Sequence, residues 1–308
     1  MKRDFLSFAD FGRGELEEIL HLAARLKGDL KAGKQPALLA GKSLAMIFEK
    51  PSLRTRVTFE IGMGQLGGRP VYLTPQDIQL GQRESVADIA RNLERWVDLI
   101  MARTYSHTTL VELARHAGVP VINGLSDRLH PCQVLADCFT LIEKRGRLDG
   151  LRIAFVGDAN NVANSWIDAA AKFHFEFILA SPPGYEPDAL TLEAARAAGA
   201  RVTVTHDAAA AARGAEVFYT DVWTSMGQES ETEKRRRDFA DYQINASLLQ
   251  LGSPDAVVMH CLPAHRGEEI TDDVIEGPHS IVFDQAENRL HIQKAIMVWL
   301  SDKVKTHR

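Results

Sequence analysis

The apolar run Leu44–Phe48, the turn Glu49-Lys50-Pro51 and the segment Ser52-Leu53-Arg54-Thr55-Arg56 are the stretch that decides the fold. The apolar run predicts a buried strand. The segment after the turn predicts a helix, because a serine at the N-cap accepts a hydrogen bond from a free backbone N–H group. A strand that leads through a short turn into a helix is the unit from which parallel α/β sheets are built.

The start of this predicted helix is also suited to an anion. Free backbone N–H groups, the positive end of the helix dipole, two hydroxyl groups and the guanidinium groups of Arg54 and Arg56 together fit a phosphate dianion. A capped surface helix with scattered arginines would show the same local pattern. The remainder of the chain therefore has to decide between the two interpretations.

Strand-like and helical segments alternate along the whole chain, which is typical of parallel sheets covered by helices. Before residue 150, we expect strands at 43–48, 70–73, 99–102 and 120–122, and helices at 15–31, from 52, and at 85–96, 108–117 and 130–145. After residue 150, we expect strands at 152–156, 177–180, 202–204, 217–220, 257–260 and 281–283, a helix from about 162, and a final helix at 286–304.

This alternation predicts an α/β protein of two domains, each a parallel sheet flanked by helices, with the functional site in the cleft between them. A length of 308 residues is comfortable for two domains of ordinary size. We expect the first domain to cover residues 1–148 and the second to cover 149–286. The C-terminal helix, residues 287–308, is long enough to pack back on the first domain.

The composition limits which kinds of partner the protein is expected to bind. The net charge of −5 argues against nucleic acid, because binding to a phosphate backbone needs a dense basic face. The one basic cluster, Lys234-Arg235-Arg236-Arg237, is bracketed by acidic residues and is interpreted as a solvated helix. No apolar run approaches the roughly 20 residues of a membrane span. Without a signal-like stretch at residues 1–5, a cytoplasmic enzyme that binds no membrane is expected.

The cysteines fit neither a disulfide framework nor a closed zinc site. There are three of them, Cys132, Cys138 and Cys261, and none forms a C-x-x-C pair. We interpret Cys132 and Cys138 as small buried apolar residues. Cys261 lies in a polar segment and is treated as a candidate site residue.

Polar residues follow several of the predicted strands. In open α/β sheets, ligands bind beyond the carboxyl ends of the strands, so residues far apart in the sequence can line one site. The residues in such positions are Ser52, Arg103, His130, Asp158, Asn161, Asp221, His260 and Cys261. Arg103 alone is ambiguous, because it would also serve as a structural partner of Asp98 or Glu112.

Two of these positions suggest an amide-like or amino-acid ligand. His130 and Gln133 lie three apart at a helix start, hence on one face, where they would hold a carbamoyl group. A histidine N-cap with a solvent-facing glutamine is the alternative. The turn 157–165 lacks the glycines of a dinucleotide fingerprint and better suits a carboxylate or an amino-acid backbone. Its alternative is helix capping by Asn160 or Asn161.

The segment 221–229 contains groups that would bind a zwitterion. Asp221 would take an ammonium group, Ser225 and the Met226 N–H would take a carboxylate, and Gly227 suggests a mobile loop. The segment 260–269 combines a thiol, two imidazoles and a guanidinium group, but its spacing matches no closed zinc site. A cysteine-protease arrangement stays open as an alternative there.

Taken together, five segments resemble the ornithine carbamoyltransferases, in that family's order and over essentially the whole chain. They are Ser52–Arg56, His130–Gln133, Asp158–Ser165, Asp221–Glu229 and His260–Glu269. The last two are highly specific, whereas the first two are shared with aspartate carbamoyltransferases. One position departs from the family pattern, because Leu53 stands where a threonine is usual.

The resemblance implies a role for each matching residue. Residues 1–148 would bind carbamoyl phosphate, and residues 149–286 would bind ornithine. The implied carbamoyl phosphate site consists of Ser52, Leu53 (through its backbone), Arg54, Thr55, Gln79 from a neighbouring subunit, Arg103, His130, Gln133 and Arg289. The implied ornithine site consists of Asn161, Asp221, Ser225, Met226, Cys261 and Leu262. The implied catalytic residues are Arg103, His130, Cys261 and Thr55.

The implied reaction transfers a carbamoyl group to the δ-amine of L-ornithine, giving L-citrulline and phosphate, with arginine biosynthesis as the expected pathway. No metal and no organic cofactor is required by this chemistry, and a homotrimer or a multiple of trimers is implied. Cys261 would position the amine and handle its proton rather than act as a covalent nucleophile. A carbamoyltransferase for putrescine or N-acylated ornithine is the alternative within the class. A nicotinamide-dependent enzyme and a non-catalytic homologue are the alternatives outside it.

Overall fold

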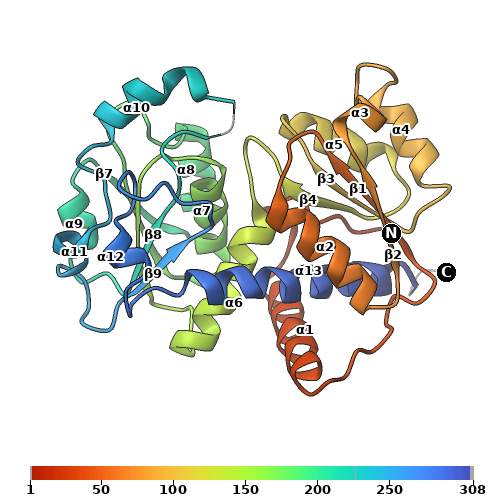
Figure 1. Ribbon diagram of the computed structural model, residues 1–308, viewed down its shortest axis with the longest axis horizontal. Coiled ribbons are helices and arrows are strands. Elements are labelled where there is room, and N and C mark those ends of the chain that lie inside the picture. Colours follow the sequence, from red (N-terminus) through yellow and green to blue (C-terminus); the bar gives the residue numbers. More distant parts are fainter. Residues whose placement is uncertain (1, 226, 306–308) are drawn as a thin grey trace. The chain divides into compact units, whose positions relative to one another are not determined.

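The computed structural model describes residues 2–225 and 227–305 and divides the chain into two compact units (Figure 1). Unit 1 comprises the chain up to Phe139 and resumes at Glu287, and unit 2 is Thr140–Ala286. Each unit contains one parallel sheet with helices packed on it, so the predicted α/β fold class is confirmed.

The sheet of unit 1 has four parallel strands in the order β2-β1-β3-β4. The strands are β1 (Ser43–Phe48), β2 (Arg69–Leu73), β3 (Leu99–Arg103) and β4 (Val121–Leu125). Every residue of β3 is buried, as expected for a strand with helices on both faces. The pairing of β3 with β4 shifts between Ala102 and Arg103, so the regular ladder ends where the polar residues begin.

The helices of unit 1 begin where the sequence supplies a cap. Ser85, for example, accepts a hydrogen bond from the Asp88 N–H at 3.1 Å. The helices are α1 (Arg13–Lys31), α2 (Leu53–Gln65), α3 (Pro75–Ile78), α4 (Val86–Leu93), α5 (His107–His116), α6 (Pro131–Arg145) and α13 (Val282–Lys305), with a 3-10 turn η1 (Phe8–Asp10). The division into units assigns the first part of α6 and the part of α13 from Glu287 to unit 1.

The sheet of unit 2 has five parallel strands in the order β7-β6-β5-β8-β9. They are β5 (Arg152–Val156), β6 (Glu176–Ala180), β7 (Arg201–Thr205), β8 (Val217–Thr220) and β9 (Val257–His260). The helices are α7 (Asn161–Phe173), α8 (Ala189–Ala197), α9 (Ala208–Ala212), α10 (Thr232–Asp238), α11 (Ala246–Leu249) and α12 (Asp272–Ile275), with η2 (Glu229–Glu231). Aromatic rings of Phe155, Trp166, Phe177 and Tyr219 pack against one another in the core between α7 and the sheet.

The predicted strand at 281–283 is wrong. Only Ser280 forms a bridge with Val258, and α13 already begins at Val282, four residues before the predicted start. The Ile281 N–H donates to the Val258 carbonyl, and the Ile281 carbonyl then accepts from the Gln285 N–H. The apolar residues 281–283 therefore belong to the start of a helix beside β9. A run of only three apolar residues does not distinguish a helix start from a strand.

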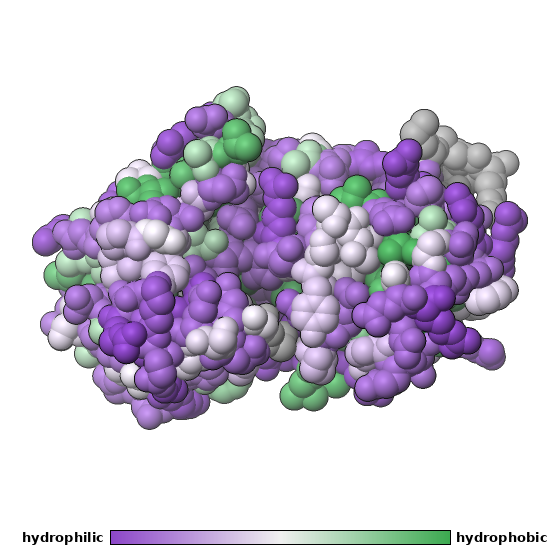
Figure 2. All heavy atoms as spheres, turned by 90° about the horizontal axis from the view of Figure 1, so that it is seen from above, coloured by the Kyte–Doolittle hydropathy of each residue, from purple (hydrophilic) through white to green (hydrophobic). Residues whose placement is uncertain are grey.

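The face of the molecule shown in Figure 2 is mostly hydrophilic. The face in Figure 2 shows polar residues with apolar ones in separate small groups. Among the described residues, large apolar side chains that remain exposed include Leu53, Trp96, Leu190 and Phe283. Within residues 2–225 and 227–305, no helix combines the length and the apolar character required to cross a membrane.

Candidate active site

The start of α2 is capped as its sequence predicts. Ser52 has an extended backbone, and its hydroxyl accepts a hydrogen bond from the Thr55 N–H at 3.3 Å. Thr55 is fully buried, and its own hydroxyl oxygen accepts from Nη2 of Arg289 at 2.9 Å. Because the hydroxyl accepts in that bond, its hydrogen can be directed at a substrate oxygen. Leu53, the first residue of the helix, is 75% exposed.

The two arginines of this segment have different surroundings. Arg56 lies over the ring of Tyr72 and pairs with Glu60 one turn along the exposed side of α2. Arg54 acts instead on His130, whose protonation it disfavours. The sequence pattern grouped the two guanidinium groups together, whereas in the structure Arg56 contacts Tyr72 and Glu60 and the charge of Arg54 acts on His130.

Three positive charges converge on the buried His130, which immediately precedes α6. Burial is the main reason that the pKa of His130 lies well below its usual value of 6.5, and the neighbouring charges lower it further. Those charges belong to Arg289, Arg103 and Arg54, which come from α13, the end of β3 and the first turn of α2. A neutral imidazole among three guanidinium groups can donate one N–H without adding a charge.

Gln133 lies on the first turn of α6 and is buried. Its Nε2 donates a hydrogen bond to Oδ1 of Asp137 at 2.8 Å. Within the part of the chain that the structure describes, the buried Oε1 of Gln133 has no hydrogen-bonding partner. A buried acceptor of this kind is costly unless a ligand supplies a donor. The alternative of a solvent-facing glutamine is wrong.

The two structural cysteines behave as interpreted from the sequence. Cys132 and Cys138 are both buried on α6. Burial raises the pKa of the Cys132 thiol to about 12, and its Sγ donates to the Asn123 carbonyl at 3.2 Å. Both thiols are therefore packing residues rather than reactive groups.

Gln79 stands apart from these groups. It follows α3 with a left-handed backbone, at φ 42°, and its side chain is exposed. The structure of one chain shows no hydrogen bond from the Gln79 side chain to the described residues around His130.

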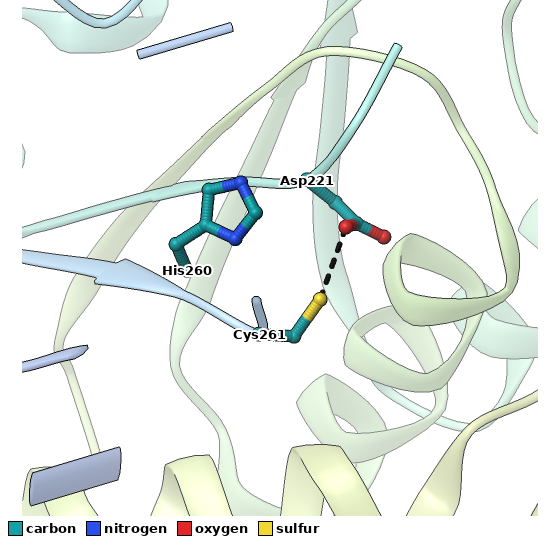
Figure 3. Close-up of side chains that lie close together, drawn as sticks. All are labelled: Asp221, His260 and Cys261. Atoms are coloured by element: carbon teal, nitrogen blue, oxygen red, sulfur yellow. Dashed lines mark hydrogen bonds between the residues drawn. The ribbon is translucent and has the colours of Figure 1, made fainter. Parts of the chain in front are cut away.

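In unit 2, three elements meet at the carboxylate of Asp221, which directly follows β8. Its Oδ1 accepts from Sγ of Cys261 at 3.0 Å, and its Oδ2 accepts from Nδ2 of Asn160 at 2.7 Å. Figure 3 shows the thiol of Cys261 pointing at this carboxylate from the end of β9. Asp221, Cys261 and the turn before α7 therefore form one connected polar group.

Asn160 is the cap of α7. Its Oδ1 accepts from the N–H groups of Val162 and Ala163 at 2.9 and 3.2 Å, while its Nδ2 reaches Asp221. The capping alternative is thus confirmed for Asn160. Asn161, which the resemblance implied as a substrate ligand, is the first residue of the helix and follows directly.

His260 holds the loop that carries Cys261 and Leu262. Its Nδ1 accepts from the Leu262 N–H at 2.9 Å, which places the ring proton on Nε2, where it is donated to Oε1 of the buried Glu269 at 3.0 Å. Leu262 adopts a left-handed backbone at φ 57°, a conformation that costs a leucine roughly 1–2 kcal/mol and needs support of this kind.

Metal-type side chains do cluster at this point, since ligand atoms of Asp221, His260 and Cys261 lie within 4.8 Å of one another (Figure 3). Their geometry is already accounted for by hydrogen bonds, because both ring nitrogens of His260 are engaged and the thiol is directed at Asp221. The cluster is therefore interpreted as a hydrogen-bonded scaffold.

Arg235 is a positioning residue that the sequence interpretation missed. The basic segment was expected to be solvated, but Arg235 is buried on α10 and donates to Asp158 and to the Trp223 carbonyl, both at 2.9 Å. Burial raises the pKa of Asp158, and the charge of Arg235 opposes that rise. The guanidinium group thereby joins the loop after β5 to the loop after β8. The pattern of charges along the segment contained no sign of which arginine turns inward.

The loop 221–229 is only partly described. The Ser225 N–H donates to the side chain of Gln228 at 3.2 Å, and Gly227 has φ 96°, a value that favours glycine. Met226 lies outside the described residues.

Comparison with known proteins identifies the family. A model of the "Aspartate/ornithine carbamoyltransferase, carbamoyl-P binding domain" matches residues 3–143, and one of the "Asp/Orn binding domain" matches 149–300. The ornithine carbamoyltransferase of Methanoculleus marisnigri is 58% identical over 97% of both chains, and that of Thermococcus kodakarensis is 52% identical over 98% of both.

Solved structures agree with these relatives. The ornithine carbamoyltransferase of Pyrococcus furiosus superposes with a TM-score of 0.93 at 51% identity, covering 96% of both chains. A mutant of N-acetyl-L-ornithine transcarbamylase superposes with a TM-score of 0.87 at 32% identity, covering 97% of this chain and 99% of that one. The resemblance predicted from the five segments is confirmed, and the chain belongs to the aspartate/ornithine carbamoyltransferase family.

Proposed function

We propose that this protein transfers the carbamoyl group of carbamoyl phosphate to the δ-amine of L-ornithine, producing L-citrulline and phosphate. The observation that carries the proposal is the set of three guanidinium groups around a buried, neutral His130. Such a set suits a substrate that combines a phosphate dianion with a polarised carbonyl group.

Unit 1 supplies the groups for carbamoyl phosphate. Ser52, the Leu53 N–H, Arg54 and Thr55 bind the phosphate at the start of α2, with Arg289 beside them. Arg103 bridges the phosphate and the carbonyl oxygen, and Gln133 accepts from the carbamoyl nitrogen. These assignments are supported by the hydrogen bond between Arg289 and Thr55, the charges around His130 and the unused acceptor of Gln133.

Unit 2 supplies the groups for ornithine. Asn161, Asp221, Ser225 and Met226 hold the α-amino and α-carboxylate groups, and Cys261 with Leu262 meets the δ-amine. The carboxylate of Asp221 suits an ammonium ion. Its hydrogen bond from Cys261 connects the residue proposed for the α-amino group with the residue proposed for the δ-amine. The N-acetyl-L-ornithine transcarbamylase that superposes on this chain shares its fold, so the identity of the amine substrate is the point to test.

The chemistry follows from these groups. The δ-amine must first lose a proton, because its pKa by analogy with lysine is about 10.4 and only the neutral amine has a lone pair. The nitrogen then attacks the carbamoyl carbon, an N–C bond forms, and the C–O bond to phosphate breaks. His130, Arg103 and Thr55 stabilise the oxyanion that develops, each donor contributing roughly 3–4 kcal/mol in comparable sites. The second proton of the amine leaves with phosphate or solvent.

A product assay tests the reaction. The purified protein is given carbamoyl phosphate labelled with ¹⁴C together with ornithine, putrescine or N-acetylornithine, and the products are separated. We expect labelled citrulline from ornithine and at least about 100-fold lower rates with the other amines, which lack part of the zwitterion. Product with another amine and none with ornithine would contradict the proposal.

We also propose a homotrimer, or a multiple of trimers, in which Gln79 completes the site of a neighbouring subunit. Two observations support it. Val57 and Ile61 lie one turn apart on α2 and are 46% and 49% exposed, and Val71 on the edge strand β2 is 46% exposed. Gln79 itself projects from an exposed segment.

A mixing experiment tests this arrangement. Subunits carrying Gln79→Ala are combined with subunits carrying Arg54→Ala, each nearly inactive alone, and reassembled after mild dissociation. Each hybrid trimer would contain one site in three that has both an intact Arg54 and an intact Gln79 from its neighbour. Activity should therefore return to about a third of the wild type in pure hybrids and to about a quarter in a random equal mixture. Sedimentation of a fully active monomer, or mixtures that stay inactive, would count against the shared site.

The pathway and compartment that we propose are arginine biosynthesis and the cytoplasm. Citrulline carries the ureido group from which a guanidinium group can be made, which supports the biosynthetic direction. Expression in a bacterial arginine auxotroph that lacks ornithine carbamoyltransferase should restore growth without arginine.

A further inference from the structure

The orientation of the Gln133 side-chain amide has a cause in the next turn of α6. Gln133 and Asp137 lie four residues apart, so their side chains share one face of the helix. Both are buried, with exposed fractions of 1% and 0%. The hydrogen bond between them is therefore shielded from water, and such a bond is stronger in the low-dielectric interior than in solvent.

A carboxylate can only accept hydrogen bonds, whereas an amide has a donor end and an acceptor end. The carboxylate of Asp137 therefore selects the NH₂ end of Gln133, and Nε2 donates to Oδ1 at 2.8 Å. The carbonyl end is left facing the other way, and among the described residues nothing donates to Oε1. Burial raises the pKa of the adjacent Cys138 thiol well above its usual value, and the negative charge of Asp137 raises it further.

We propose that Asp137 is a positioning residue that fixes the polarity of the Gln133 amide, so that the site accepts an acyl phosphate with an N–H donor and disfavours one without it. This inference rests on the proposed function and deepens it. Gln133 touches the carbamoyl group, whereas Asp137 influences that group through its hydrogen bond with Gln133. With the amide reversed, two NH₂ groups would face each other and the carbamoyl nitrogen would lose its acceptor.

Acetyl phosphate is the probe, because a methyl group replaces the NH₂ group of carbamoyl phosphate. Its inhibition constant against carbamoyl phosphate, compared with the KM for carbamoyl phosphate, measures how strongly the site requires an N–H donor. In the wild type we expect a ratio of at least about 10, since a buried acceptor left unpaired is penalised. A ratio near 1 would overturn the proposal without any variant.

The decisive variant is Asp137→Asn. Asparagine has both a donor and an acceptor, so Gln133 can bond it in either orientation. We expect the KM for carbamoyl phosphate to rise about tenfold, while the inhibition constants of acetyl phosphate and inorganic phosphate change less than about threefold. A purely structural role would weaken all three ligands together, and that result, or an unchanged ratio, would refute the assignment.

The matched test is the exchange Gln133→Glu with Asp137→Asn. It keeps the net charge and both partners of the hydrogen bond, and it again presents an oxygen to the substrate, because the new asparagine donates to the new glutamate. We expect the exchange to recover the wild-type selectivity to within about threefold, while Gln133→Glu alone places two carboxylates together and does not. If Asp137→Asn fails to fold in a thermal melt, the exchange and the wild-type ratio still decide the question.

Citrulline formation by the wild type separates this inference from the proposed function. Failure to form citrulline would remove the proposed function. Citrulline formation with a selectivity that is indifferent to Asp137 would remove only this inference.

Discussion

The two candidate half-sites are built in opposite ways. In unit 1 the polar groups are three cations, of which Arg103 and Arg289 are buried, and the amide of Gln133, with His130 kept neutral among them. In unit 2 the centre is a carboxylate, Asp221, held by side chains from loops that follow β5 and β9. The first arrangement is cationic and carried mainly by helices, and the second is anionic and carried by loops.

The difference matches the two proposed substrates. A phosphate dianion gains most from several fixed positive charges, whose mutual repulsion is tolerated only when secondary structure holds them in place. A flexible diamino acid gains from directional hydrogen bonds on segments that can adjust. Arg235 and His260 each join these segments to a buried carboxylate, Asp158 and Glu269 respectively.

The largest expected effect comes from removing one cation from the candidate half-site of unit 1. Replacement of Arg54 by alanine should lower kcat/KM for carbamoyl phosphate about 1,000-fold, because a charge-assisted contact to the phosphate and the developing oxyanion is lost. Steady-state kinetics with saturating ornithine measure the loss, and circular dichroism checks the fold.

The matched control is Arg56→Ala on the same helix turn. Its side chain faces Glu60 and Tyr72, so kcat/KM should stay within about threefold of the wild type. Equal losses in the two variants would show that the segment binds through its total charge rather than through one placed guanidinium group.

The second largest expected effect comes from neutralising the carboxylate at the centre of the unit 2 half-site. Asp221→Asn should raise the KM for ornithine about 100-fold and leave the KM for carbamoyl phosphate within about twofold, because a charged partner of the ammonium group becomes neutral. Asp238→Asn is the control, since Asp238 lies in unit 2 but pairs with Lys234 and Tyr185 instead. A change confined to carbamoyl phosphate would reverse the assignment of the halves.

The third effect concerns the neutral histidine of unit 1. The folded pKa of His130 lies well below 6.5, so below pH 6.5 the unfolded chain binds a proton that the native protein excludes. Stability should therefore fall as the pH drops, by up to about 1.4 kcal/mol per pH unit from this group.

Urea unfolding of the wild type and of His130→Asn at pH 7, 6 and 5 measures that contribution as the difference between the two slopes. The variant should have the shallower dependence. Parallel slopes would mean that His130 becomes protonated in the folded protein and would contradict the view of a neutral donor among three arginines.

The smallest effect sharpens the comparison at Leu53. Its side chain is exposed on the first turn of α2, where the resembling family has a threonine. Leu53→Thr should lower the KM for carbamoyl phosphate by about twofold to threefold, because one hydroxyl group is added near a site whose backbone already donates. The same change at Leu190, which is exposed in unit 2, should leave that KM unaltered.

The sequence predicted the strands well because their apolar runs are short, buried and bounded by turn residues. Strands β1, β5, β8 and β9 begin and end where they were expected. The error at 281–283 arose where an apolar triplet starts a helix instead. Helix starts were predicted from local capping chemistry, as at Ser52 and Ser85, and these need no information from distant parts of the chain.

Pairings that depend on which side chains are buried were not predictable in the same way. The spacing of Gln133 and Asp137 was visible, but not that both are buried and bonded to each other. Likewise, four consecutive basic residues did not indicate that Arg235 alone would turn inward to Asp158.

By itself, the sequence determined the α/β class, most element boundaries and the family, because periodicity, caps and motifs are local properties of the chain. Only the tertiary structure decided which charges meet. The pKa of His130 depends on burial and on arginines 27 to 159 positions away in a chain of 308 residues, and the acceptor of Gln133 depends on a neighbour's side chain. Burial and charge proximity are set by packing, and packing is a property of the folded chain.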